Sequence, residues 1–214
     1  MSKVTEKTGN AFALVIFALC FPIISIGAAH LTWSVSLIAM LATTILLGVI
    51  QTQWHTAWVA GIAAVCAIVA ASAHWLLLPL LLAQVGLAVI VATQKLTPGV
   101  RATGLLLVAA FVQVALMLNQ NSILATPFLF DLLFQLLPFI FIALGDKLPL
   151  LARGAGLLII IVAAYLLQRY TIVAALTCII LGLVPAFVKK MPVAYYPLAA
   201  TVLGVIIHLS MMHG

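Results

Sequence analysis

One apolar stretch contains the two side chains that are most costly to place in a nonpolar environment. Residues 122–144, SILATPFLFDLLFQLLPFIFIAL, place Asp131 and Gln135 between runs of aliphatic and aromatic residues. A carboxylate at the centre of a bilayer costs about 2.5–3.5 kcal/mol on insertion scales, so an acid there is by default a candidate for function. Residues four apart share one face of a helix. The spacing therefore predicts a polar site formed by Asp131 and Gln135.

Two prolines, Pro127 and Pro138, flank this pair. A proline has no backbone N–H, so it removes a helical hydrogen bond and disturbs the preceding turn. Freed carbonyl oxygens beside a buried acid would hold a cation or a proton, as in the broken helices of transporters. The alternative is a kinked helix whose acid is neutral, or is paired to hold two helices together. The sequence leaves both interpretations open.

Arg169 is the expected partner of Asp131. In a nine-span topology with a cytoplasmic N-terminus, Asp131 lies in the outer half of its segment, and Arg169 follows the next segment on the same side. A guanidinium group at this position would stabilise the charge of the carboxylate. We expect such a pair to act as a helix clamp, a gate or a site that recognises anions.

Two further glutamines, Gln84 and Gln113, fall inside apolar runs. In hydrocarbon each must find a hydrogen-bond partner or face a wet cavity. Together with Gln135 and Asp131 they would line one polar path through the membrane. The alternative is that each glutamine forms a hydrogen bond that packs two helices together.

The composition defines the elements that must position these side chains. Hydrophobic residues make up 67% of the chain and charged residues 6%, with a mean hydropathy of +1.39. Soluble domains have about 25% charged residues, so the chain is predicted to be an integral membrane protein whose partner is the lipid bilayer. Residues 1–214 form one predicted membrane domain without an extramembrane module. The nine Lys and Arg are scattered, which argues against a nucleic-acid partner.

Apolar runs of membrane length predict an all-α fold, a polytopic bundle of about nine transmembrane helices with eight as the lower limit. The runs cover residues 11–29, 34–50, 56–73, 75–93, 103–118, 123–144, 154–168, 171–188 and 195–212.

The positions of the cations predict the orientation of the bundle. Lys and Arg in short loops accumulate on the cytoplasmic side of a membrane. Nine spans place every cation except Arg169 on one side, namely Lys3, Lys7, Lys95, Arg101, Lys147, Arg153, Lys189 and Lys190. We therefore expect a cytoplasmic N-terminus and an external C-terminus, with a bacterial inner membrane as the location.

The third run, residues 56–73, is rich in alanine and glycine, with small residues four apart at Ala63 and Ala67. Such faces let two helices approach closely. We expect a central packing helix. Self-association, or binding of other membrane subunits through this face, is the alternative.

Three functions fit these residues. The first is a carrier or channel-like protein that moves a small solute, an ion or a lipid-linked substrate through a polar path at Asp131. The second is a non-catalytic membrane subunit that scaffolds a larger complex. The third and weakest is a membrane-embedded enzyme that acts on lipid with a histidine and Asp131. Walker A, HExxH and GxSxG patterns are absent from the sequence, so we expect neither a cofactor nor a metal ion.

Overall fold

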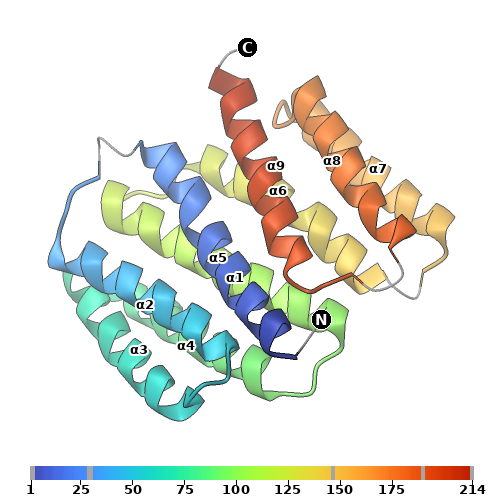
Figure 1. Cartoon of the computed structure of the whole chain (residues 1–214). Helices are drawn as coiled ribbons and strands as arrows, with labels where there is room; N and C mark the ends of the chain where they lie inside the picture. The colour runs from blue at the N-terminus through green and yellow to red at the C-terminus, as the bar shows by residue number, and fades with distance from the viewer. Residues whose placement is uncertain (1–2, 28–30, 146–147, 189–190, 213–214) are drawn as a thin grey trace.

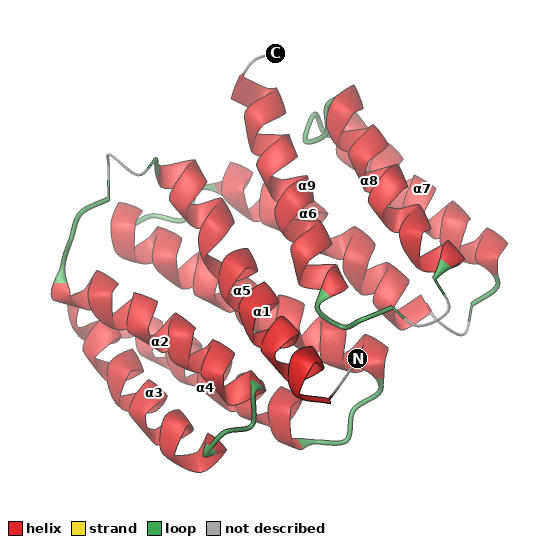
Figure 2. Ribbon diagram, viewed as in Figure 1, coloured by secondary structure: helices red, strands yellow, loops and turns green. Residues whose placement is uncertain are grey.

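The computed structural model describes residues 3–27, 31–145, 148–188 and 191–212, and within these ranges it contains α-helices, short 3₁₀ turns and loops but no strand (Figure 2). The predicted all-α class is therefore confirmed. The α-helices are α1 Lys3–Ile26, α2 Val35–Gln51, α3 Thr56–Ala70, α4 Leu78–Thr93, α5 Pro98–Asn121, α6 Thr126–Leu144, α7 Leu150–Leu166, α8 Ile172–Phe187 and α9 Tyr195–Met212.

Hydroxyl side chains fix the starts of three helices. Ser34 accepts a hydrogen bond from the N–H of Leu37 at the start of α2, and Thr97 and Thr171 cap α5 and α8 in the same way. Each cap satisfies a backbone donor that has no partner inside the helix. The polar residues between the apolar runs therefore determine where these helices begin.

Five helical stretches are long and apolar enough to cross a membrane: Val4–Ile26, Thr56–Ala73, Trp75–Thr93, Pro98–Asn121 and Thr126–Leu144. This indicates an integral membrane protein. The other apolar helices, α2, α7, α8 and α9, fall below 18 residues in their apolar parts. A 17-residue helix is about 25 Å long, close to the lower limit for a hydrocarbon core of about 30 Å. For these helices the crossing stays a prediction.

Four helices form a closed ring at the centre of the bundle. α1 packs against α5, α5 against α6, α6 against α9, and α9 against α1. α2, α3 and α4 cover the α1–α5 side of this ring, and α7 and α8 cover the α6–α9 side (Figure 1). A Cβ atom on Gly99 would lie 2.1 Å from the carbonyl oxygen of Ala143, so this glycine allows the close approach of α5 to α6.

Contacts between helix termini define two ends of the bundle. At the end that holds the start of α1, which we call the N-terminal end, Gly9 lies beside Ala194, and Gly145 lies beside Arg153. At the opposite end Thr32 bonds Gln120. Lys7, Lys95, Arg101 and Arg153 belong to segments at the N-terminal end, whereas Arg169 lies at the opposite end; Lys147, Lys189 and Lys190 lie outside the described residues. Which end faces the cytoplasm stays a prediction.

The small-residue face of α3 packs inside the chain. Ala63, Ala67 and Ala70 have no exposed surface, and the hydroxyl of Ser36 on α2 donates to the carbonyl of Ala70. The helix is nevertheless peripheral rather than central, because it packs mainly against α2 and α4 and leaves Ile62 and its neighbours exposed. The small residues allow one close helix contact, and the large aliphatic residues on the other face suit lipid.

Candidate functional site

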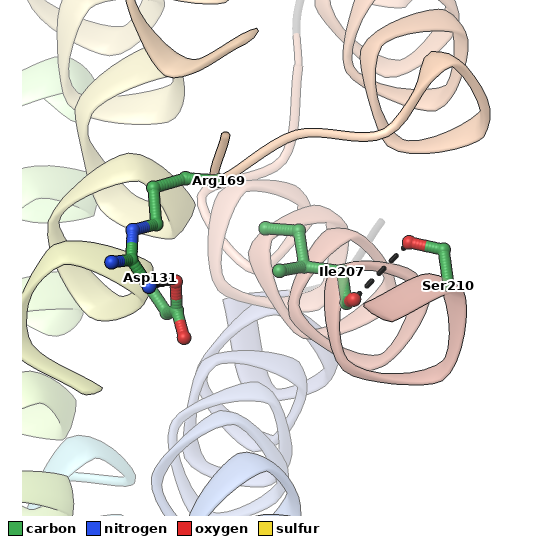
Figure 3. Close-up of polar contacts among 4 residues, drawn as sticks. All are labelled: Asp131, Arg169, Ile207 and Ser210. Atoms are coloured by element: carbon green, nitrogen blue, oxygen red, sulfur yellow. Dashed lines mark hydrogen bonds and ion pairs between the residues drawn. The ribbon is translucent and has the colours of Figure 1, made fainter. Parts of the chain in front are cut away.

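The structure brings Asp131 and Arg169 together, as the sequence predicts. Asp131 lies in the second turn of α6, and Arg169 lies in the connection between α7 and α8 (Figure 3). A guanidinium nitrogen of Arg169 is 3.6 Å from Oδ1 of Asp131, and the two side chains are 27% and 18% exposed, respectively. This distance exceeds that of a strong charge-assisted hydrogen bond, which is about 2.7–2.9 Å. The pair is therefore electrostatic and can be reached from one end of the bundle.

The Asp131 carboxylate has unused capacity to accept hydrogen bonds. Its Oδ1 atom is buried and has no hydrogen-bond partner among the described residues. His208 on α9 is close enough to interact electrostatically with Asp131. The carboxylate thus lies near two groups that can carry positive charge, and the oxygen that pairs with Arg169 accepts no hydrogen bond among the described residues.

Arg169 lies within residues 167–171, which we call the strap, and hydrogen bonds hold this segment in place. Gln168 has φ of 57°, and the N–H groups of Arg169 and Tyr170 both donate to the carbonyl of Ala164. At the far end of the strap, the Thr171 hydroxyl donates to Ser210 of α9 over 2.8 Å. The strap is therefore bonded to the end of α7 and to the end of α9.

The Ser210 hydroxyl in turn donates to the carbonyl of Ile207 over 3.1 Å (Figure 3). Thr171, which also accepts from the N–H of Ala174, thus belongs to a chain of hydrogen bonds that joins the start of α8 to the end of α9. Chains of hydrogen bonds polarise and strengthen one another.

Tyr170 binds the backbone carbonyl that Pro138 leaves without a donor. In a regular helix the carbonyl of Phe134 accepts from the N–H of residue 138, which proline lacks. The Tyr170 hydroxyl donates to this carbonyl over 2.7 Å. Burial raises the pKa of Tyr170 above its ordinary value, so the hydroxyl keeps its hydrogen at physiological pH. The carbonyl that we expected to be open for a cation is therefore occupied.

Pro127 also differs from the expectation. It lies in the first turn of α6, where backbone N–H groups have no helical partner, so it leaves no carbonyl of α6 unpaired.

The same arrangement occurs a second time. Pro185 interrupts α8, and the Tyr195 hydroxyl donates to the carbonyl of Leu181, four residues before the proline, over 2.6 Å. Sequence reasoning missed both tyrosines. The sequence feature that could have identified them is a proline inside a helix. Such a proline leaves the carbonyl four residues earlier without its helical donor, so a side chain from outside the helix must donate to it.

Gln135 joins α6 to α9 one turn deeper than Asp131. Its amide donates to the carbonyl of Ala200 over 2.9 Å, and its Oε1 atom is buried and has no hydrogen-bond partner in the described part of the chain. A Cβ atom on Gly204 would lie 2.0 Å from the Gln135 amide nitrogen, so the glycine makes space for this side chain. Gln135 thus opposes the Ala200–Gly204 turn, and Asp131 interacts with His208 one turn further along α9.

Gln113 and Gln84 lie in other helix interfaces. Gln113 of α5 donates to the carbonyl of Phe17 on α1 over 2.7 Å. Gln84 of α4 is buried, in a helix that packs against α2, α3 and α5. In both glutamines Oε1 accepts no hydrogen bond from any residue that the structure describes. Of the five predicted site residues, the structure groups Asp131, Arg169 and Gln135.

A hollow of about 40 Å³ lies between α6, α7 and α8, far from Asp131. It is lined mostly by aliphatic residues and glycines, with Arg153 as its charged residue. Ile142, which lines it, is eleven residues beyond Asp131 on α6, a separation of about 16 Å along the helix. This hollow therefore belongs to the N-terminal end of the bundle.

Among the described residues, no three His, Cys, Asp or Glu side chains form a cluster able to hold a metal ion. No protein-family model, curated protein or solved structure matches this chain.

Proposed function

We propose that this protein is a small membrane carrier or channel-like protein, and that its site is formed by Asp131, Arg169 and Gln135. One observation carries the proposal: an ionisable carboxylate lies inside an apolar helix, and its buried Oδ1 atom, which accepts no hydrogen bond among the described residues, lies 3.6 Å from a cation that can be reached from one end of the bundle. Intramembrane acids of this kind mark substrate or proton pathways. The protein is proposed to reside in a bacterial inner membrane with its N-terminus in the cytoplasm.

Protonation of Asp131 is the switch in this mechanism. The charged pair holds the Arg169 side chain against α6, and a neutral Asp131 releases that side chain from the attraction while Tyr170 keeps the strap bonded to α6. Gln135 lies one turn deeper, and Phe139, two turns beyond Asp131, is fully buried. In this mechanism the Phe139 ring closes the route toward the N-terminal end. Alternation between an Arg169 side chain that is held and one that is free would admit a solute at one end and release it toward the other.

Purified protein in liposomes that contain a pH-sensitive dye tests this proposal. We expect a panel of small solutes to include one that evokes a change of internal pH, and we expect Asp131→Asn to reduce that rate at least tenfold. Glu6→Gln is the matched control, because it neutralises an exposed acid in the first turn of α1. Equal rates in Asp131→Asn and the unmodified protein would exclude this carrier mechanism.

A membrane subunit without its own transport activity is the second candidate. It is favoured by the use of Gln113 and Gln135 as bonds between helices of the central ring. This function predicts that the protein, extracted in mild detergent, co-purifies with other membrane proteins at fixed stoichiometry. A protein that is isolated alone and intact would argue against it.

A further inference from the structure

We propose that the Asp131–Arg169 site binds one small carboxylate anion together with one proton, and that the anion replaces the Asp131 carboxylate beside Arg169. This inference rests on the proposed function and names the substrate class of the same site. It starts from the group that now lies beside the guanidinium, which is itself a carboxylate.

The Arg169 guanidinium has N–H donors that its contacts among the described residues do not use. A guanidinium group carries five N–H donors in a planar fork that matches a carboxylate. Among the described residues, this side chain contacts Asp131 through an ion pair at 3.6 Å and the ring of Phe130, whose centroid lies 5.8 Å from the guanidinium carbon. Neither contact uses the paired hydrogen bonds that the fork can form with a carboxylate. The strap meanwhile holds the backbone of Arg169 through Ala164 and through Thr171.

The charge of the site determines how many protons accompany the anion. With Asp131 ionised, the pair is neutral, and an added monoanion would leave one net negative charge in a poorly hydrated site. With Asp131 protonated, Arg169 and the monoanion form a neutral pair again. Uncompensated buried charge is unfavourable, so the anion and the proton bind cooperatively. A dianion would not be neutralised by one proton, which favours a monocarboxylate over a dicarboxylate.

The groups that act on Asp131 set the pH dependence. Among the described residues these are Arg169 from the strap and His208 from α9. His208 is the other possible proton acceptor, so the experiment includes His208→Gln. In the exchange itself, a proton from water binds the Asp131 carboxylate, the ion pair with Arg169 breaks, and two N–H groups of Arg169 form hydrogen bonds to the incoming anion.

The test uses the full-length protein in lipid nanodiscs, with sodium acetate, lactate and benzoate as probes. Ionic strength is held constant with a bulky sulfonate. Binding is measured as the increase in the thermal unfolding midpoint, and proton uptake is measured with a pH-stat. For the unmodified protein we expect binding that weakens as the pH rises, with about one proton taken up per bound anion.

The variants distinguish this site from a structural pair. Asp131→Asn should bind the carboxylate equally well at low and high pH and take up no proton, because Arg169 is permanently available. Arg169→Gln should lose binding at every pH, and Arg169→Lys should bind at least tenfold more weakly because it lacks the fork. Arg101→Gln, at the N-terminal end, is the matched control and should bind normally. His208→Gln should retain proton uptake.

Three results would overturn the inference: no binding of any probe to Asp131→Asn, binding retained by Arg169→Gln, or proton uptake retained by Asp131→Asn. Monodisperse elution of each variant in size-exclusion chromatography shows that it is folded. The outcomes also separate this inference from the proposed function. Carboxylate binding without transport in liposomes contradicts the carrier, whereas transport of solutes without carboxylate binding contradicts the inference alone.

Discussion

The hydroxyl of Tyr170 donates to the carbonyl of Phe134, and this bond replaces the one that Pro138 cannot make. It fixes the strap to the interrupted turn of α6, three residues from Asp131. The position of Arg169 next to Asp131 thus depends on a proline in one helix and a tyrosine in a distant connection.

Tyr170→Phe should destabilise the protein by about 1–3 kcal/mol, because it leaves the buried carbonyl of Phe134 without a donor. In a Pro138→Ala background the restored N–H satisfies that carbonyl, so the same substitution should cost much less. The measurement is a double-mutant cycle of unfolding free energies in bicelles. Tyr165→Phe, at an exposed tyrosine of α7, is the control. Equal costs in both backgrounds would show that the bond does not compensate for the proline.

Replacing both members of the ion pair should be milder than replacing one. Arg169→Gln leaves the Asp131 carboxylate partly buried without its cation, which we expect to cost about 1–2 kcal/mol after allowance for the exposure of both side chains. The Asp131→Asn and Arg169→Gln double variant removes both charges. Its unfolding free energy should therefore lie closer to that of the unmodified protein, and a double variant no milder than Asp131→Asn alone would contradict the pairing.

Gly204→Ala should destabilise the α6–α9 interface by about 1–3 kcal/mol. The new Cβ atom would lie 2.0 Å from the Gln135 amide nitrogen, whose side chain is fully buried and bonded to Ala200. Gly61→Ala on α3 is the matched control, since nothing lies within 4 Å of its Cβ position, and it should stabilise by up to about 1 kcal/mol. Thermal unfolding midpoints of Gly204→Ala and Gly61→Ala that shift in the same direction would contradict this prediction.

Cysteine labelling tests the orientation of the bundle. In a variant without native cysteines, Leu167→Cys on the strap should react with a membrane-impermeant maleimide added to intact cells. Gln94→Cys, in the connection between α4 and α5, should react only after the membrane is opened. Both native side chains are exposed. The reverse pattern would invert the predicted topology, and labelling of both positions from one side would change the number of spans.

Sequence reasoning predicted the Asp131–Arg169 contact because it needed only the order of the helices and the distribution of charge. It did not predict the roles of Tyr170, His208 and Gly204, since these depend on the rotation and axial position of α9 and of the strap relative to α6. Periodicity in one chain does not define that packing. For the same reason it assigned α3 to the centre of the bundle, although one small-residue face is equally compatible with a peripheral helix.

The glutamines illustrate a related limit. The sequence identified Gln84, Gln113 and Gln135 as side chains that need partners in hydrocarbon. It could not decide between a shared path and separate helix contacts, because each amide is satisfied by any nearby carbonyl. In the structure Gln113 bonds α1 and Gln135 bonds α9. Whether their unpaired oxygens contact a solute stays a prediction.

Infrared difference spectroscopy of the protein in lipid tests the central claim most directly, namely that Asp131 exchanges a proton with the solution. Spectra are compared between about pH 5 and pH 8, the range in which a physiological switch must act. We expect a carboxylic C=O stretching band at low pH that is lost in Asp131→Asn, retained in Glu6→Gln and shifted in the midpoint of its pH dependence in Arg169→Gln. Identical difference spectra for the unmodified protein and Asp131→Asn would contradict it and leave Asp131 as a structural residue.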